Sequence, residues 1–142
     1  MAPIKQPDYE TLAEFRYSLR LFLRFSEDAA HQVGLTPRQH QALLAIQGFP
    51  DNRRITIGEL AERLQIRHHS AVELVNRLAL DGLVVRKSSA EDHRRVYVTL
   101  TKHGKNILEK LSAVHKQELR RIGPQLNQMI EILSADKRTS DF

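Results

Sequence analysis

A charged turn followed by an alternating segment is the part of this sequence best suited to binding chemistry. The turn at residues 92–95 reads Asp-His-Arg-Arg, and residues 96–100 then alternate apolar and polar side chains at the period of a strand with one buried face. Asp92 is close enough along the chain to pair with Arg94, whose guanidinium offers N–H donors that match phosphates and base edges. Residues 83–87 supply a partner strand. We therefore predict a hairpin with a basic tip, a β-wing.

Two short helices are predicted before this hairpin. Thr56 and Glu59 have the spacing of a capping box, which starts a helix over residues 57–64. A second helix over residues 68–80 follows after about three residues. This spacing is typical of a helix-turn-helix, although Gln65 stands where a turn glycine is usual.

The second helix and the hairpin carry the candidate nucleic-acid contacts. Those on or next to the helix lie off its apolar face, and they are Arg67, His68, His69, Ser70, Glu73, Asn76 and Arg77. Those on the hairpin are Arg86, Lys87, Asp92, His93, Arg94 and Arg95. The competing interpretation is a set of ordinary solvated side chains.

The net charge favours a polyanionic partner for the same region. Residues 53–105 contain 11 Lys/Arg and 6 Asp/Glu, so this segment alone carries a net charge equal to the +5 of the whole chain. The two flanking segments are nearly balanced in charge. A solvated basic face is the alternative explanation of this charge.

Composition excludes several other classes of protein. At 142 residues with 41% hydrophobic residues the chain is expected to form a single domain, 1–142, and the absence of cysteine excludes disulfides and thiolate metal sites. No apolar run is long enough to span a bilayer, and the first residues lack the apolar core of a signal peptide, so we expect a cytoplasmic, prokaryotic protein without a membrane partner. Neither a nucleophile-elbow serine nor a glycine-rich phosphate loop is present, so we expect no enzyme and no cofactor.

Long amphipathic helices are predicted on both sides of the basic region. Apolar residues recur every three or four positions over residues 9–33, and another helix runs from Thr36-Pro37 to Gly48. A fifth helix starts at Thr101, and we expect Gly123-Pro124 to break it and a sixth to follow. These flanking stripes exceed what a lone winged helix could cover, which indicates a second copy of the chain.

Four motifs in this order make the sequence similar to a known family. They are Leu-Ala-Glu-Arg-Leu at 60–64, the segment 78–86 ending in Gly-Leu-Val-Val-Arg, Asp-x-Arg at 92–94, and Leu-Thr-x-x-Gly at 100–104. Together they resemble the MarR family of bacterial transcription regulators over nearly the whole chain. The resemblance implies a mainly α fold with a small β-wing, a winged helix-turn-helix with N- and C-terminal dimerisation helices. Its lobe would cover 36–100 and its dimerisation helices 8–34 plus 101–135, with a flexible tail at 136–142.

The resemblance also implies a function. It implies a homodimer, acting as a repressor, that binds a pseudo-palindromic site in double-stranded DNA, with the second helix of the motif in the major groove and the wing in the minor groove. Arg94 takes the place of the family's wing arginine, and Asp92 that of the acid that orients it. His93 and Arg95 differ from the common pattern, which leaves open whether Arg94 or Arg95 enters the groove.

A small-molecule effector is a further implication of the resemblance. Members of the family commonly bind aromatic or phenolic acids between the dimerisation helices and the DNA-reading lobe. Phe15 and Phe22, with Tyr17 and Phe25, are the candidates for lining such a pocket, and Arg16 or Arg20 for holding a carboxylate. The alternative is that the phenylalanines form the dimer core and the arginines are solvated.

Two further functions compete with this interpretation. Some members of the family sense zinc, and the histidines near the dimerisation helices are His31, His40, His103 and His115, although none forms a His-x-x-x-His pair. We therefore expect no metal. A winged helix can also bind protein instead of DNA, but the basic middle segment argues against that function.

Overall fold

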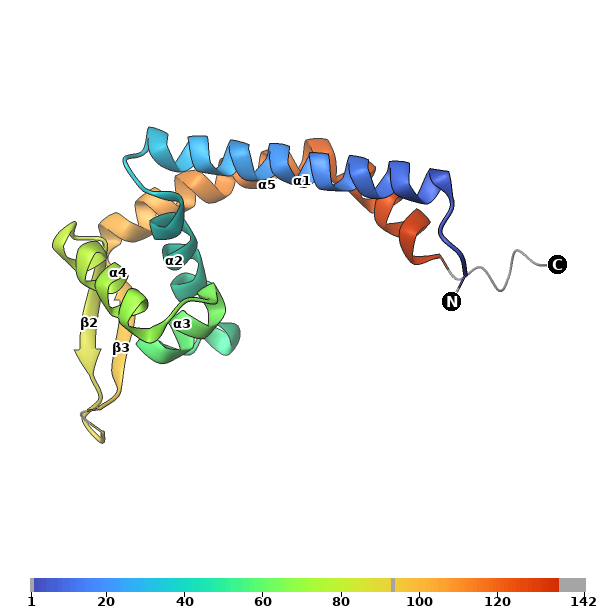
Figure 1. Cartoon of the computed structure of the whole chain (residues 1–142). Helices are drawn as coiled ribbons and strands as arrows, with labels where there is room; N and C mark the ends of the chain where they lie inside the picture. Colours follow the sequence, from blue (N-terminus) through green and yellow to red (C-terminus); the bar gives the residue numbers. More distant parts are fainter. Residues whose placement is uncertain (1, 93, 136–142) are drawn as a thin grey trace. The chain divides into compact units, whose positions relative to one another are not determined.

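The computed structural model describes residues 2–92 and 94–135, which form a mainly helical chain with one small sheet (Figure 1). The elements in chain order are α1 (Gln6–Gln32), α2 (Pro37–Gln47), the 3-10 turn η1 (Pro50–Asn52), β1 (Ile55–Thr56), α3 (Ile57–Leu64), α4 (His68–Leu80), β2 (Val84–Ser88), β3 (Val96–Leu100) and α5 (Lys102–Ser134). They divide into a central unit, residues 29–112, and a terminal-helix unit, formed among the described residues by 2–28 and 113–135. The tail predicted at 136–142 lies outside the described residues.

The helices of the central unit begin at polar caps. Thr36 and Thr56 each accept a hydrogen bond from the backbone of the residue three positions on, and the side chains of Gln39 and Glu59 accept one from the backbone N–H of the capping threonine. The capping box predicted at Thr56 is confirmed. The one at Thr36 completes an N-cap for which the sequence had indicated only threonine and proline.

The turn of the helix-turn-helix depends on a residue in the left-handed region. Gln65 has φ 55° and ψ 47°, a conformation that glycine adopts at less cost. Its Nε2 donates to the carbonyl oxygen of Glu62 at 2.8 Å, so the side chain satisfies a carbonyl at the end of α3. Gln65 therefore holds the place predicted for a turn glycine.

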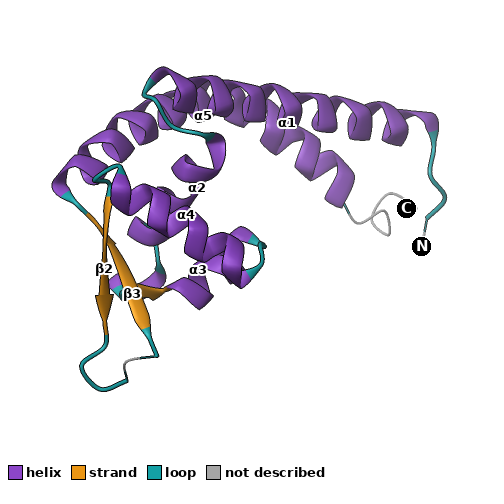
Figure 2. Ribbon diagram, turned by 60° about the vertical axis from the view of Figure 1, so that its left-hand side comes forward, coloured by secondary structure: helices purple, strands orange, loops and turns teal. Residues whose placement is uncertain are grey.

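The strands form one antiparallel sheet in the order β1-β3-β2 (Figure 2). Val84 pairs with Leu100 and Ser88 with Val96, so β2 and β3 make the predicted hairpin. The short β1 adds to the other edge of β3 through Ile55 and Val98. On β3, Val98 and Leu100 are buried as the predicted alternation requires, whereas Val96, Tyr97 and Thr99 are half-buried.

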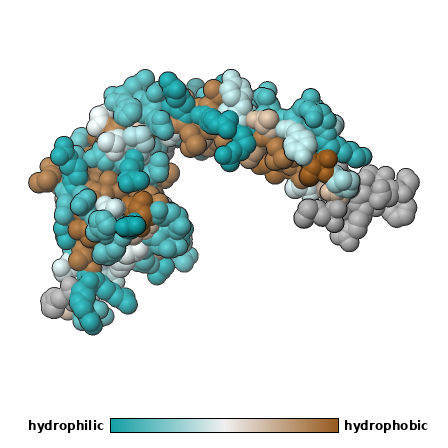
Figure 3. Space-filling view, in the orientation of Figure 1, coloured by the Kyte–Doolittle hydropathy of each residue, from teal (hydrophilic) through white to brown (hydrophobic). Residues whose placement is uncertain are grey.

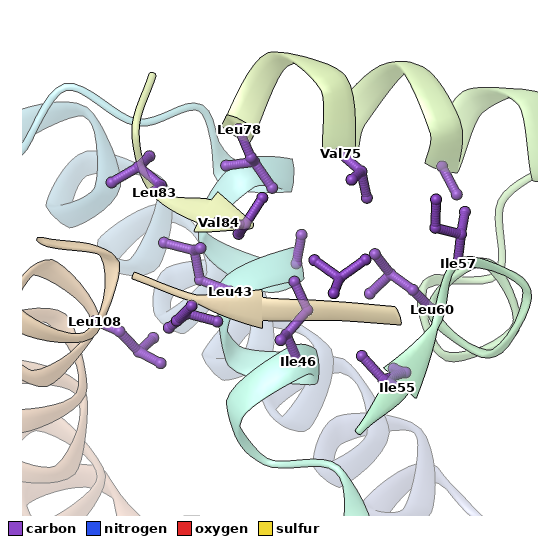
Figure 4. Packing of buried hydrophobic residues seen from close by; sticks show 14 of the residues in the cluster. Leu43, Ile46, Ile55, Ile57, Leu60, Val75, Leu78, Leu83, Val84 and Leu108 are labelled. Carbon is purple, nitrogen blue, oxygen red and sulfur yellow. The ribbon is translucent and has the colours of Figure 1, made fainter. Parts of the chain in front are cut away.

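One hydrophobic core holds the central unit together (Figure 4). It takes side chains from all the helices and strands of that unit, and those almost fully buried are Leu43, Ile55, Leu60, Val75, Leu78, Val98 and Leu111. Replacing one of the large ones by alanine costs about 2–5 kcal/mol in a packed core. The polar face of α4 is therefore presented to solvent by the burial of its other face.

A close backbone contact fixes the start of α5. Thr101 donates from its backbone N–H to the Leu83 carbonyl at 3.0 Å and from its hydroxyl to the Gly82 carbonyl at 2.7 Å, while its Oγ1 accepts from the Gly104 N–H. A Cβ atom at Gly104 would lie 2.2 Å from the Leu83 carbonyl oxygen. The glycine of the Leu-Thr-x-x-Gly motif is thus required by the packing of α5 on the turn before β2.

The predicted break at Gly123-Pro124 is wrong, because α5 continues through Pro124 to Ser134. Proline removes one helical hydrogen bond and crowds the preceding turn. Gly123 has no Cβ, so the crowding that disfavours helical geometry before proline is reduced. Ile122 and Leu126, which flank this Gly-Pro pair, are both half-buried and lie four positions apart. The apolar face of α5 therefore continues across Pro124.

The segment between α2 and β1 contains one short helical turn. Pro50–Asn52 form a 3-10 turn in which Asp51 and Asn52 have positive φ angles of 60° and 54°. Aspartate and asparagine tolerate this region better than other residues with a Cβ atom.

The terminal-helix unit has contacts but no core of its own. The ring of His115 lies edge-on to those of Phe22 and Phe25, and its Nε2 is 2.7 Å from the Ser26 hydroxyl. Among its described residues, no side chain is fully buried. Figure 3 shows apolar side chains on the surface of these helices.

Hydropathy gives no sign of a membrane segment in the described part of the chain, where none of the helices has the length and apolar character needed to cross a bilayer.

The contact at Gly104 yields a test of the fold. Gly104→Ala is expected to lower the free energy of unfolding by about 1–3 kcal/mol, because the added methyl group collides with a backbone atom and this outweighs the gain in helix propensity. Urea unfolding measures the change. Gly58→Ala is the control, since its Cβ would meet nothing closer than 3.9 Å and helix propensity alone predicts no loss. Equal urea midpoints for Gly104→Ala and the wild type would contradict the close contact between Gly104 and the Leu83 carbonyl oxygen.

Candidate nucleic-acid interface

A groove of about 730 Å³ lies on the central unit between the start of α4, the start of α3 and the wing. Six basic residues line it, and they are Arg53, Arg54, His68, Arg86, Arg94 and Arg95. The acid in its lining, Glu59, is hydrogen-bonded within the capping box of α3. The groove therefore has the size and the charge to receive an anionic chain.

The candidate contacts of α4 lie on its open face. Ala71, Val75 and Leu78 are buried, which leaves the predicted polar residues exposed except for Ser70, which is half-buried. Of this set, His68 lines the groove. Arg77 lies 3.7 Å from the carboxylate of Asp81, in an exposed pair one helical turn apart.

The tip of the wing is organised by one carboxylate. Asp92 accepts hydrogen bonds from the backbone N–H of Arg94 at 3.0 Å and from its Nε at 3.4 Å, and its other oxygen is 4.0 Å from Nε of Arg95. Ser89 supports the turn, because its hydroxyl accepts from the N–H groups of Glu91 and Asp92. His93 lies outside the described residues.

Such an arrangement positions arginines more than it stabilises the fold. The side chains of Arg94 and Arg95 are 94% and 66% exposed, and exposed ion pairs contribute little to stability. Both guanidiniums are nevertheless directed by Asp92, as the sequence predicted for Arg94.

A contact between the wing and α4 joins two of the candidate residues. Nη1 of Arg86 on β2 donates to Oδ1 of Asn76 on α4. The structure thus brings these two predicted DNA contacts onto each other. The remaining wing candidate, Lys87, is exposed and pairs in register with Tyr97 on β3.

Three residues that line the groove were not predicted as candidate contacts from the sequence. Arg54 lies with Cζ 4.4 Å from the ring centroid of Tyr97, and Arg53 with Cζ 5.0 Å from that of Phe49. Arg53, Arg54 and Tyr97 all line the groove. Two features of the sequence could have indicated them. These are the pair of adjacent arginines just before β1 and the aromatic residue that alternates with the buried residues of β3.

The predicted effector residues are only partly brought together. In the terminal-helix unit, a cleft of about 400 Å³ is lined by Tyr17, Phe22 and Phe25 but not by Phe15, Arg16 or Arg20. The arginine in its lining is Arg121, which binds Glu118 at 2.5 Å. The hydrogen bond from Arg121 lowers the pKa of the Glu118 carboxyl below its usual value.

The four histidines considered for zinc do not converge. His31 and His103 are exposed, His40 is buried and His115 contacts Ser26. Within residues 2–92 and 94–135 no three histidine or acidic side chains gather as metal ligands would.

Comparison with curated proteins finds transcription regulators. The chain is 27% identical over 100 residues to the HTH-type transcriptional regulator SarZ of Staphylococcus epidermidis, covering 70% of this chain and 66% of SarZ. It is 29% identical over 79 residues to the organic hydroperoxide resistance transcriptional regulator of Bacillus subtilis, covering 56% of this chain and 52% of that protein. The matches thus span between half and two thirds of these relatives' own length.

Solved structures share the fold. A MarR family protein from Bacillus stearothermophilus has a TM-score of 0.74 at 20% identity, covering 99% of this chain and 91% of that one. MepR, a transcription regulator of the Staphylococcus aureus multidrug efflux pump MepA, has a TM-score of 0.72 at 21% identity, covering 89% and 94%.

The sequence model of the MarR family matches residues 33–95, the stretch that holds the helix-turn-helix and the wing up to its arginines. These similarities agree with the basic groove and the winged helix-turn-helix described above, and the chain is similar in sequence and in fold to the MarR family of transcription regulators.

Proposed function

We propose that the chain binds an operator in double-stranded DNA as a homodimer and represses transcription there, in the cytoplasm. The groove lined by six basic side chains, between the start of α4 and the wing, is the observation that carries the proposal. A protein that occupies an operator keeps other proteins off it, so repression is the simplest output. Two copies related by a two-fold axis would read half-sites about one helical turn apart.

In this proposal, a lobe over residues 36–100 reads both grooves of the DNA. The start of α4 enters the major groove, where Arg67, His68, His69, Ser70 and Glu73 meet bases and phosphates, with Asn76 and Arg77 further along the helix. The wing reaches the neighbouring minor groove. We assign Arg94 to that groove, because its side chain is 94% exposed while Asp92 already directs it.

The proposal of a homodimer rests on the terminal-helix unit. Its large apolar side chains with two-fifths or more of their surface exposed are Ile4, Tyr9, Leu12, Tyr17, Leu21, Leu23, Val114, Leu119, Ile130 and Ile132. Two helices without a buried side chain between them do not stand alone in water. The same helices of a second copy would cover this surface, which assigns dimerisation to residues 8–34 and 101–135.

We also propose that a small aromatic molecule releases the DNA. The cleft beside Tyr17, Phe22 and Phe25 supplies three aromatic rings for it. An acidic effector would meet Arg121, but it would have to displace Glu118 from that arginine.

The minor-groove assignment is tested by Arg94→Ala. Loss of this guanidinium is expected to weaken operator binding by about 1–3 kcal/mol. Fluorescence anisotropy at fixed salt, with an operator selected from random DNA by the purified protein, measures the effect. Arg38→Ala removes the same charge from an exposed position outside the groove and is expected to bind like the wild type. Equal affinities of the Arg94→Ala protein and the wild type would reject the assignment.

The dimer is tested by charges on the apolar surface. Leu21→Glu combined with Leu119→Glu is expected to shift the chain from dimer to monomer in sedimentation equilibrium, because burying two unpaired carboxylates costs more than the apolar contacts gain. Leu80→Glu is the control, since Leu80 is 82% exposed but belongs to the central unit. If the double variant is dimeric over the same protein concentrations as the wild type, the dimer interface must lie elsewhere.

A further inference from the structure

Three arginines of the central unit are held against aromatic rings. The Cζ atom of Arg54 is 4.4 Å from the ring centroid of Tyr97, while those of Arg53 and Arg63 are 5.0 and 5.2 Å from that of Phe49. Over the described residues none of the three forms an ion pair or a side-chain hydrogen bond. Their positive charges are therefore positioned without being neutralised.

Stacking leaves a guanidinium ready for an anion. When an aromatic ring packs on the flat face of a guanidinium, the N–H donors at the edge of the group stay available and can bind a phosphate with two parallel hydrogen bonds. The ring also restricts a side chain that otherwise loses much rotamer freedom on binding.

Both rings are attached to rigid parts of the fold. Phe49 is 7% exposed and belongs to the core of the central unit. Tyr97 sits on the central strand β3, where it pairs with Thr56 on one side and Lys87 on the other. Arg53 and Arg54 are thus held by groups that do not depend on DNA for their position.

The place of Arg53 and Arg54 suggests which anion they meet. Both line the groove that separates His68 on α4 from Arg94 and Arg95 on the wing. In B-form DNA a single sugar-phosphate strand separates a major groove from the adjacent minor groove. If α4 reads the one and the wing reads the other, that strand must lie in this groove.

We propose that Arg53 and Arg54 bind phosphates of the strand that crosses between α4 and the wing, and that Phe49 and Tyr97 act as positioning residues for them. The inference rests on the proposed DNA-binding function and adds a phosphate site that neither the helix-turn-helix nor the wing tip includes. In the groove, Arg94 and Arg95 are directed by Asp92, and Arg86 is bonded to Asn76. Among the described residues, no side chain binds the guanidinium donors of Arg53 or Arg54, so these donors are available to the strand. Because every nucleotide carries the same phosphate, their contribution is independent of base sequence.

Salt dependence is the direct test of this phosphate site. The wild type, Arg53→Ala, Arg54→Ala and the double variant are titrated with a selected operator duplex and with a scrambled duplex of equal length, over a series of salt concentrations. Each single variant is expected to reduce the slope of log affinity against log salt by about 1, and the double variant by about 2. Affinity for both duplexes should fall by the same factor, about 5- to 10-fold for each arginine at moderate salt.

The controls separate this site from the other parts of the proposal. Arg38→Ala should keep the wild-type slope, and thermal unfolding should show that every variant is folded. A wild-type slope in the Arg54→Ala and Arg53→Ala proteins would overturn the phosphate site while leaving DNA binding intact. A loss confined to the selected duplex would overturn it in favour of a base contact. If the wild type binds neither duplex, the proposed function itself fails.

Tyr97 is tested through its ring. Tyr97→Phe keeps the stacked ring and should bind DNA like the wild type, whereas Tyr97→Leu should weaken both duplexes several-fold. In an Arg54→Ala background, Tyr97→Leu should have no further effect, because the ring acts through Arg54. Equal losses for the phenylalanine and leucine variants would show that the hydroxyl touches DNA. An undiminished loss in the Arg54→Ala background would show that Tyr97 acts without Arg54.

Discussion

The hydrogen bonds between Thr101 and the Gly82-Leu83 turn are the constraint on which the rest of the central unit depends. They join the end of α4, the start of β2, the end of β3 and the start of α5 at one point. Gly104 allows α5 to approach that point, and the hairpin leaves it as a pair of strands with a fixed register. The wing is therefore anchored at its base by backbone groups, while its tip is free to carry charge.

Local signals explain what the sequence could predict. The bounds of α3 and α4, the capping box at Thr56 and the hairpin all follow from caps, turns and periodicity within a few residues, and the structure confirms them. The comparisons with known proteins likewise agree with the predicted resemblance to the MarR family and with its winged helix-turn-helix fold. The sequence did not predict that α5 is continuous, because proline usually interrupts a helix. Here Gly123 before the proline and the continuing apolar face offset that effect.

The groove could not be predicted in full because its residues meet only in three dimensions. Arg54 and Tyr97 are far apart in sequence and come together because β1 adds to β3. The pairing of Arg86 with Asn76 depends on how β2 packs beside α4. By contrast, Asp92 and Arg94 are close in the chain, so their contact was visible in the sequence. The roles of the individual side chains on DNA remain predictions.

The bond between Arg86 and Asn76 links the two parts of the molecule that would read DNA. One end belongs to the helix that is proposed to read base edges, and the other to the strand that carries the wing. In the proposed complex, a shift of α4 at a mismatched base pair would be passed to the wing through this bond, and a change in minor-groove width would be passed back. Sequence recognition and shape recognition would then be cooperative within a single subunit, so the energetic penalties of a wrong base and of a wrong groove width would not simply add.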